Sequence, residues 1–176
     1  MRMIEIRRHS MRSIPGAHLS QEGVALARRV GQEMGPFERV VTSTLPRAFE
    51  TAIAMGFAVN EQVELMSTYG DVVEQEVPWP QSFGAYAKAV KRDKAAARYA
   101  QQLAEYYREL AAFIANGHGH AALVINHGGI VGLGIVAFFP DAGYESWGDS
   151  VSYCEGARLS WQDGTCVHAE LLRVRS

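Results

Sequence analysis

The sequence predicts an α/β fold, namely a three-layer α/β/α sandwich whose central sheet is mostly parallel and has an antiparallel edge. Segments with strand patterns alternate with segments with helical patterns along most of the chain. Residues 121–126, AALVIN, are almost entirely apolar, as expected for a central strand that is buried on both faces. The turn Asp163-Gly164 separates two strand-like runs and predicts an antiparallel hairpin. The length of 176 residues fits one domain, residues 1–176.

The N-terminal part of the chain is predicted to form a strand followed by a helix. Residues 3–8 alternate apolar and polar side chains, which favours a strand that ends at His9. The next segment is rich in Ser, Pro and Gly and predicts a loop. Ser20 is expected to cap a helix that continues to about Met34. The buried stripe of this helix is expected to consist of Leu26, Val30 and Met34.

A second strand and helix are predicted directly afterwards. Residues 38–42 favour a short strand. Ser43 or Thr44 is expected to cap the next helix, with Pro46 in its first turn, where the missing N–H group does no harm. The helix is expected to end at Gly56.

The middle of the chain carries weaker signals. Residues 62–66 are predicted as a third strand, whereas residues 67–84 show no clear period. Residues 85–115 are rich in Ala, Tyr, Lys and Gln and favour helix throughout, as one or two helices. A further helix is predicted from about 130 to 138. The last two strands are expected at 157–161 and 166–172.

The composition is that of an ordinary soluble globular protein, with 48% hydrophobic and 20% charged residues. The net charge of −2 argues against nucleic acid or an anionic membrane as the main partner. No apolar stretch suits a signal peptide or a membrane span, so a cytoplasmic location is expected. Cys154 and Cys166 are then expected to be free thiols, and without a matching His cluster they predict no metal site.

Basic side chains follow three of the predicted strands. The first strand ends in Arg8-His9, and the second leads into a helix whose first turn holds Arg47. The apolar strand 121–126 ends at His127. In open α/β sheets ligands bind outside the carboxyl ends of the strands, so these four side chains are expected to meet in one crevice.

Each of these residues alone has an ordinary structural explanation. A His after a buried strand often satisfies a hydrogen bond, and an Arg in the first turn of a helix usually lies in solvent, where it opposes the helix dipole. Together they suit a phosphoryl group. Arginine forks grip two oxygens, a neutral imidazole is a competent nucleophile, and a helix N-terminus attracts an anion. Arg47 in particular needs a nearby anion to justify its position.

Four motifs in the sequence occur in the order seen in a known family. Arg8-His9-Ser10 resembles an Arg-His-Gly signature, and residues 19–23, LSQEG, resemble a Leu-Thr-x-x-Gly helix start. Residues 43–51, STLPRAFET, are similar to a Ser-x-x-x-Arg-Ala-x-x-Thr segment, and residues 124–129, VINHGG, to a second histidine motif. In these motifs the chain resembles the histidine phosphatase superfamily, also called phosphoglycerate mutase-like.

The resemblance implies a phosphoglycerate mutase-like fold and a role for each matched residue. His9 would attack phosphorus and carry the phosphoryl group. Arg8, Arg47 and His127 would hold the phosphoryl oxygens and stabilise charge in the transition state. Water would then hydrolyse the phosphohistidine. No metal ion or other cofactor is implied, because the arginines act as the cationic clamp.

The chain departs from the family pattern at two places. Ser10 stands where the family usually has Gly, and it is expected either to donate to a phosphoryl oxygen of the substrate or simply to be tolerated. Many members carry an acidic residue in a Leu-x-Glu pattern after the third strand, but residues 65–71, LMSTYGD, place no carboxylate there. The candidates for a general acid are Glu64, Asp71, Glu74 and Glu76. Arg12, in the loop after the first strand, is either a substrate contact or a surface charge.

The sequence therefore predicts a metal-independent phosphatase that acts on a phosphomonoester or a phosphoramidate, in a phosphorylated small molecule or a phosphoprotein. The chain resembles the short bacterial phosphohistidine phosphatases in size. A phosphosugar mutase of the same superfamily is one alternative, and the short loop at residues 10–18 argues against it. A non-catalytic module that binds a phosphorylated ligand is the other, and vanadate binding without turnover would identify it. The natural substrate and the oligomeric state are not predicted.

Overall fold

The protein is built from alternating strands and helices, and the computed structural model describes residues 1–117 and 119–174. The strands are β1 (Arg2–Arg8), β2 (Arg39–Thr42), β3 (Glu61–Gln62), β4 (Ala121–Asn126), β5 (Gly156–Gln162) and β6 (Thr165–Leu172). The α-helices are α1 (Gln21–Gly31), α2 (Pro46–Ala54), α3 (Gly70–Glu76), α4 (Phe83–Val90), α5 (Ala95–Asn116) and α6 (Gly128–Val136). Short 3-10 turns lie at Glu64–Met66 and Glu145–Trp147.

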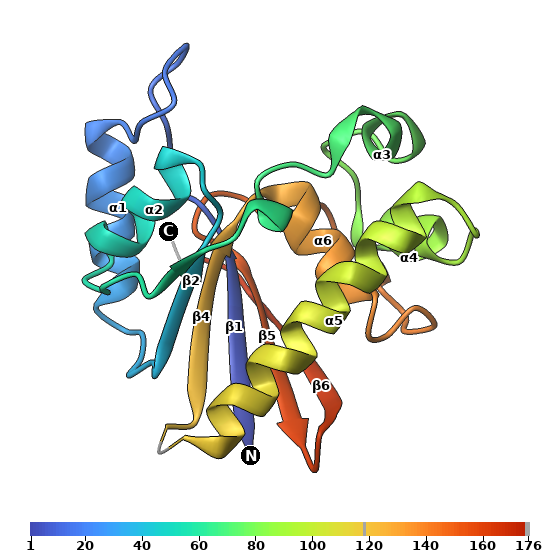
Figure 1. Cartoon of the computed structure of the whole chain (residues 1–176). Coiled ribbons are helices and arrows are strands. Elements are labelled where there is room, and N and C mark those ends of the chain that lie inside the picture. Colours follow the sequence, from blue (N-terminus) through green and yellow to red (C-terminus); the bar gives the residue numbers. More distant parts are fainter. Residues whose placement is uncertain (118, 175–176) are drawn as a thin grey trace.

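Helices cover both faces of the sheet, which confirms the predicted three-layer sandwich. Over the described residues the strand order is β3-β2-β4-β1-β5-β6. Strand β4 lies between β1 and β2 and pairs in parallel with both, whereas β5 and β6 add the antiparallel edge. Helices α1 and α2 pack on one face, and α4, α5 and α6 on the other (Figure 1). Every residue of β4 is buried, because both faces of this central strand are covered.

The hairpin between β5 and β6 forms at the predicted turn. Asp163 and Gly164 have φ values of 50° and 77°, and two residues with positive φ are typical of the two-residue turns that match the twist of a hairpin. The two cysteines, Cys154 and Cys166, are free thiols, as predicted. No helix in the described part of the chain is long and apolar enough to cross a membrane.

Helix α1 begins as predicted but ends earlier. The Ser20 side chain caps it by accepting a hydrogen bond from the Gly23 N–H group. The helix ends at Gly31, not at Met34. The predicted stripe of Leu26, Val30 and Met34 packs against the core as expected, but its side chains are only partly buried. The buried positions of this helix are Gly23, Ala27 and Gly31.

Small residues make up that buried face because backbone lies directly against it. A Cβ atom on Gly31 would lie 2.2 Å from the carbonyl oxygen of Met55, and one on Gly23 would lie 2.0 Å from that of Met11. Apolar periodicity selects large side chains, so it missed a helix face on which close backbone approach is what matters.

Helix α2 has no side-chain cap, so the prediction that Ser43 or Thr44 caps it is wrong. The N-cap residue is Leu45, and Pro46 occupies the first helical position as expected. The Ser43 hydroxyl lies 2.8 Å from Nε2 of His127 instead, which ties the end of β2 to the end of β4.

The middle of the chain differs most from the prediction. The third strand, expected at 62–66, contains only Glu61–Gln62 and continues into a 3-10 turn. The segment 67–84, which shows no clear period in the sequence, contains helix α3. The long helical segment is confirmed as two helices, α4 and α5, and α6 begins two residues before the predicted start.

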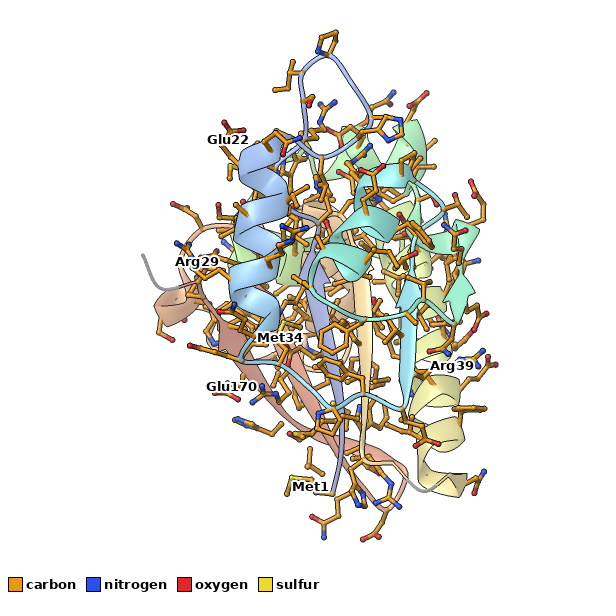
Figure 2. All side chains as sticks on the ribbon, turned by 90° about the vertical axis from the view of Figure 1, so that its left-hand side faces the viewer. Met1, Glu22, Arg29, Met34, Arg39 and Glu170 are labelled. Carbon is orange, nitrogen blue, oxygen red and sulfur yellow. The ribbon has the colours of Figure 1, made fainter. Side chains whose placement is uncertain are left out.

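The carboxyl ends of β1, β2 and β4 meet at one edge of the sheet. Figure 2 views the protein from the side of α1 and α2, with Met1 at the bottom and Arg39, the first residue of β2, in the lower half. The loop that follows β1 rises above the opposite edge, where the parallel strands end. This edge is the one at which a ligand site is expected.

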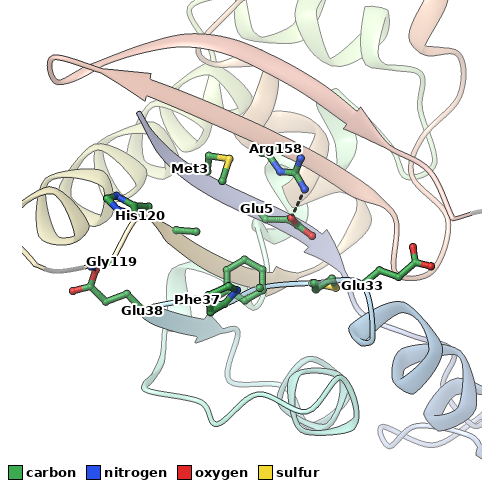
Figure 3. A pocket seen from close by; sticks show the side chains of 12 residues that line it. Met3, Glu5, Glu33, Phe37, Glu38, Gly119, His120 and Arg158 are labelled. Carbon is green, nitrogen blue, oxygen red and sulfur yellow. Dashed lines mark hydrogen bonds and ion pairs between the residues drawn. The ribbon is translucent and has the colours of Figure 1, made fainter.

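The amino ends of β1 and β4 line a cavity of about 490 Å³, which we call the amino-end cavity (Figure 3). Phe37 forms part of its wall, and Glu5 and Arg158 lie on the sheet side. Nη2 of Arg158 lies 3.0 Å from Oε2 of Glu5, and Nη1 lies 3.3 Å from Glu170. The other oxygen of Glu5 accepts a hydrogen bond from Arg7 at 2.6 Å. The charges of this sheet face are therefore paired with one another.

Candidate active site

The carboxyl ends of β1, β2 and β4 border a cavity of about 390 Å³, which we call the carboxyl-end cavity. The predicted site residues that line it are Arg8, His9, Arg12, Arg47 and His127. Other polar and aromatic residues in its wall are Ser67, Thr68, Tyr69, Glu74, Trp79 and Tyr153. The structure thus brings five of the six predicted site residues together, and Ser10 is the one that it leaves out.

His9 is held in one orientation at the end of β1. Its backbone N–H donates to the carbonyl oxygen of Asn126 at 2.9 Å. Ring Nδ1 lies 2.7 Å from the carbonyl oxygen of Ser10, and because a carbonyl only accepts, Nδ1 carries the proton. Nε2 therefore holds the lone pair, and Nε of Arg47 donates to it at 3.2 Å. Nε2 is the ring nitrogen available for attack.

Both histidines of the cavity are neutral near pH 7. Burial lowers the pKa of His9 to about 3. The hydrogen bond to Ser10 opposes this shift, and the charge of Arg47 adds to it. Burial, together with His9 and Arg47, lowers the pKa of His127 to about 2. The ring centroids of the two histidines lie 5.1 Å apart. A neutral imidazole at Nε2 of His9 is a nucleophile without prior loss of a proton.

The three arginines of the cavity form no ion pair with a carboxylate of the described chain. Burial is the main cause that lowers the pKa of Arg47. The like charges of Arg12 and Arg8 lie close to it and lower the pKa further. Arg47 occupies the first turn of α2, beside the positive end of the helix dipole. This concentration of unpaired positive charge is favourable only when an anion binds.

Arg8 is fixed by aromatic rings and a backbone oxygen. Its guanidinium carbon lies 4.2 Å from the ring centroid of Tyr153 and 5.0 Å from that of Trp79. Nη1 donates to the carbonyl oxygen of Val151 at 3.1 Å. Arg8 is therefore oriented before any ligand binds, which favours tight binding of a planar group of oxygens.

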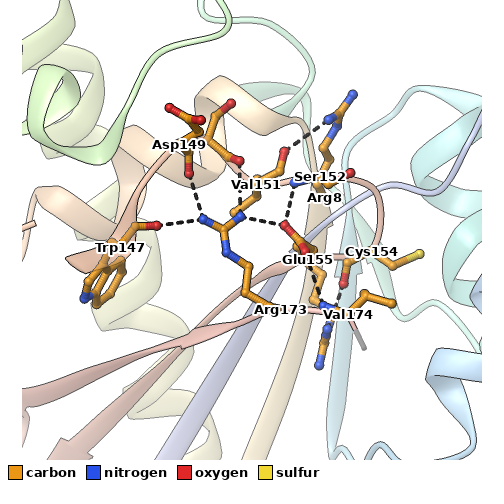
Figure 4. Close-up of polar contacts among 11 residues, drawn as sticks. Arg8, Trp147, Asp149, Val151, Ser152, Cys154, Glu155, Arg173 and Val174 are labelled. Carbon is orange, nitrogen blue, oxygen red and sulfur yellow. Dashed lines mark hydrogen bonds and ion pairs between the residues drawn. The ribbon is translucent and has the colours of Figure 1, made fainter. Parts of the chain in front are cut away.

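A polar network anchors the loop that supplies these contacts (Figure 4). Arg173, just beyond β6, donates to the backbone oxygens of Trp147, Asp149 and Ser150, and Nη1 lies 2.6 Å from the Glu155 carboxylate. That carboxylate also accepts from the N–H group of Ser152 at 2.8 Å. The loop between Trp147 and Glu155 is thus held by a residue that follows the last strand of the chain.

His127 lies at the N-terminus of helix α6 and lines the same cavity as Arg8 and Arg47. Its Nε2 lies 2.8 Å from the Ser43 hydroxyl, and Nδ1 has no hydrogen-bond partner among the described residues. The two residues that follow are glycines because aromatic rings cover them. A Cβ atom on Gly128 would lie 2.0 Å from the Trp79 ring, and one on Gly129 would lie 2.6 Å from the ring of Tyr69.

The expectation that Ser10 contacts the substrate does not fit its position. Ser10 is completely buried, and its hydroxyl donates to the carbonyl oxygen of Gly23 at 2.7 Å. Its backbone N–H donates to the Thr51 hydroxyl at 2.9 Å. The side chain points away from the cavity because it links β1 to α1, so the alternative that Ser10 is simply tolerated fits the structure.

Arg12 lies in the exposed loop after β1 and reaches the cavity from outside the sheet. Its Nη1 donates to the carbonyl oxygen of Gly16 at 3.1 Å, within the same loop. Its charge acts on both His9 and Arg47, since it contributes to the lowered pKa of each. The position fits the predicted substrate contact.

Of the four acidic candidates, only Glu74 lines the carboxyl-end cavity. Glu64 accepts a hydrogen bond from the Thr44 hydroxyl, and Asp71 is exposed on α3. Glu76 accepts from the first N–H groups of α5. Glu64, Asp71 and Glu76 are therefore not among the residues that line this cavity.

Sequence reasoning missed Tyr153 and Arg173. Each lies in a segment without a recognisable motif. The Tyr153 ring contacts Arg8, which lies more than a hundred residues away in the sequence, and Arg173 holds the loop that contacts Arg8. The described residues contain no group of three or more His, Cys, Asp or Glu side chains arranged to hold a metal ion.

Comparison with known proteins gives a family match and a common fold. A family model described as histidine phosphatase superfamily (branch 1) matches residues 6–172. The phosphoserine phosphatase of Entamoeba histolytica, in complex with 3-phosphoglyceric acid, is similar with a TM-score of 0.70 and 16% identity, covering 99% of this chain and 98% of that one. The phosphoglycerate mutase of Bacillus anthracis is similar with a TM-score of 0.65 and 15% identity, covering 98% of this chain and 92% of that one. The alpha-ribazole phosphatase of Shigella flexneri is similar with a TM-score of 0.63 and 17% identity, covering 99% of this chain and 96% of that one. No curated protein matches the sequence.

Proposed function

This chain belongs to the histidine phosphatase superfamily, and we propose that it is a phosphatase that works through a covalent phosphohistidine at His9. One observation carries the proposal. The unprotonated Nε2 of His9 lies in a cavity with three arginines that form no ion pair with a carboxylate of the described chain. A nucleophile among unpaired cations suits a dianionic electrophile, and a phosphoryl group has that charge.

The first step is attack on phosphorus. Arg8 and Arg47 grip the phosphoryl oxygens, and His127 stabilises the charge that develops on them. The N–P bond to Nε2 forms while the P–O or P–N bond to the leaving group breaks. Water then attacks phosphorus, the N–P bond breaks, and inorganic phosphate leaves neutral His9 behind.

Arg47 has two roles in the proposed reaction. In the free enzyme its Nε–H group donates to the lone pair of His9 Nε2 at 3.2 Å and so occupies the nucleophile. A bound phosphoryl group is a stronger acceptor for a guanidinium than a neutral ring nitrogen is. Substrate binding thus draws the Arg47 donor to the phosphoryl oxygens and frees Nε2 for attack.

The substrate that we propose is a small phosphorylated molecule. The cavity of about 390 Å³ admits such a ligand, and the similar E. histolytica enzyme holds 3-phosphoglyceric acid. We also propose that the reaction needs no metal ion, because Arg8, Arg12 and Arg47 already supply the positive charge that the phosphoryl group requires.

Trapping of the covalent intermediate tests the mechanism. Brief incubation with radiolabelled acetyl phosphate, followed by a quench, is expected to give an acid-labile, base-stable adduct on His9. The His9→Ala variant is expected to lose the adduct and several orders of magnitude in kcat. His120→Ala, which changes an exposed histidine at the amino-end cavity, is the matched control and is expected to behave as the wild type. An adduct on another residue, or full activity of His9→Ala, would overturn the proposal.

A further inference from the structure

The chemistry of the leaving group distinguishes the substrates that this site can serve. An alcohol that leaves without a proton is a strongly basic alkoxide, so hydrolysis of an alkyl phosphate gains much from a general acid. A phenol with electron-withdrawing groups and the nitrogen of a phosphoramidate leave with less help. The presence of a proton donor beside the phosphoryl group therefore reports on the substrate class.

Glu74 is the one residue with a carboxyl group among the described residues that line the carboxyl-end cavity. It lies in the second turn of α3, and the structure fixes both of its carboxyl oxygens. The Tyr69 hydroxyl donates to Oε2, and the backbone N–H group of Trp79 donates to Oε1 at 3.1 Å. A glutamate in an exposed loop would rotate freely, whereas this one is held by two donors in one orientation.

The two residues that hold Glu74 also pack against the phosphoryl site. The Trp79 ring covers Gly128, directly after His127, and lies 5.0 Å from the Arg8 guanidinium. The Tyr69 ring covers Gly129 in the next position. The segment that carries Glu74 is therefore in contact with the start of α6 and with Arg8, on the side of the cavity opposite the Arg47 helix.

The place where many members of the family carry an acidic residue holds Ser67 in this chain. Its hydroxyl lies 2.7 Å from that of Thr44 and accepts from the Thr44 N–H group at 3.1 Å. Ser67 lines the cavity, but an aliphatic hydroxyl is too weak an acid to protonate a leaving group. The acid function thus has no candidate at this position, and Glu74 follows seven residues later on α3.

We propose that Glu74 is the proton donor to the leaving oxygen and that the substrate class is an alkyl phosphomonoester. The proposal rests on the phosphohistidine mechanism. The reaction begins with a proton on the Glu74 carboxyl group, beside the bound phosphoryl group. As the N–P bond forms and the P–O bond breaks, the leaving oxygen takes this proton and departs as an alcohol. The Glu74 carboxylate then accepts a proton from the attacking water, the N–P bond breaks, and the starting state returns.

The test compares leaving groups in a conservative variant. Wild type and Glu74→Gln are assayed with O-phosphoserine, 3-phosphoglycerate and β-glycerophosphate as alkyl phosphates, and with p-nitrophenyl phosphate and phosphoramidate as substrates with better leaving groups. Glu74→Gln is expected to lose about 10²–10⁴-fold in kcat on the alkyl phosphates and less than about 10-fold on the others. Retained activity on p-nitrophenyl phosphate also shows that the variant is folded.

The controls separate this proposal from the mechanism on which it rests. Asp71→Asn removes an exposed carboxylate from the same helix and is expected to leave all rates unchanged. His9→Ala is expected to lose activity on every substrate. An equal loss of Glu74→Gln on both classes, no loss on either, or a wild type that hydrolyses only phosphoramidate would each overturn the proposal, whereas an active His9→Ala would overturn the phosphohistidine mechanism instead.

Discussion

The two ends of the sheet each carry a cavity bordered by charged residues, but they treat their arginines differently. At the amino-end cavity, Arg158 pairs with Glu5 and Glu170. At the carboxyl-end cavity, Arg8 and Arg47 have no carboxylate partner within the part of the chain that the structure describes. The amino-end cavity is the larger, about 490 Å³ against about 390 Å³.

The difference indicates that unpaired charge, rather than size, distinguishes the candidate active site from the other cavity. A partly buried arginine such as Arg158 that is paired within the fold has its charge already balanced and attracts an anionic ligand less. Arginines that are gathered without counter-charges repel one another, and an anion bound among them would relieve this repulsion. The comparison predicts opposite consequences when the same residue type is removed at the two ends.

Removal of one arginine at each end is the first test of that comparison. Arg47→Ala is expected to lower kcat by about 10²–10³-fold and to weaken vanadate binding strongly, because a phosphoryl contact is lost. Its free energy of unfolding is expected to stay the same or to rise, because repulsion with Arg8 and Arg12 is relieved. Arg158→Ala is expected to keep vanadate affinity and to lose about 1–2 kcal/mol in the free energy of unfolding, because Glu5 is left with one partner.

Calorimetric titration with vanadate and unfolding in urea measure the two quantities. The comparison fails if Arg158→Ala weakens vanadate binding as much as Arg47→Ala does. It fails also if Arg47→Ala is the less stable of the two variants.

The pH dependence of stability is the second test. The pKa of His9 is about 3 in the folded state against 6.5 for an unperturbed histidine, so below pH 6.5 the unfolded chain binds a proton that the folded protein does not. Stability from this group is therefore complete above about pH 6.5 and falls as the pH decreases toward 3. The slope is at most about 1.4 kcal/mol per pH unit for each such histidine.

Urea unfolding of wild type and His9→Asn between about pH 7 and pH 5 measures this term. The wild type is expected to lose more stability over this range than His9→Asn. His120→Asn, at the amino-end cavity, is expected to follow the wild type. Parallel curves for wild type and His9→Asn would contradict the neutral state assigned to the buried ring.

The anchoring of Arg8 by Arg173 gives the third and smallest effect. Arg173→Lys keeps the charge but loses the fork that reaches Trp147, Asp149 and Glu155. It is expected to lower kcat/KM by about 3–10-fold, because the loop that orients Arg8 is loosened. In an Arg8→Lys background the same change is expected to have little further effect, because the two residues act through one contact. Full additivity of the two changes would indicate that Arg173 only stabilises the fold.

The sequence by itself determined the elements that carry the chemistry. His9, Arg47 and His127 each follow a strand whose apolar pattern is strong, and the carboxyl ends of parallel strands meet at one edge of a sheet. Their convergence follows from local patterns and one topological rule. The family motifs contain the same residues and therefore predict the same crevice.

Only the tertiary structure decided the residues whose role depends on side-chain direction. Ser10 follows His9 in sequence but turns inward, because its hydroxyl donates to the Gly23 carbonyl oxygen in α1. Glu74 and Glu76 lie two residues apart on α3, and that separation places one in the cavity and the other on the N-terminus of α5. Tyr153 reaches Arg8 across the whole chain. Such contacts depend on how distant segments pack, and a local pattern carries no information about which distant partner a side chain will meet.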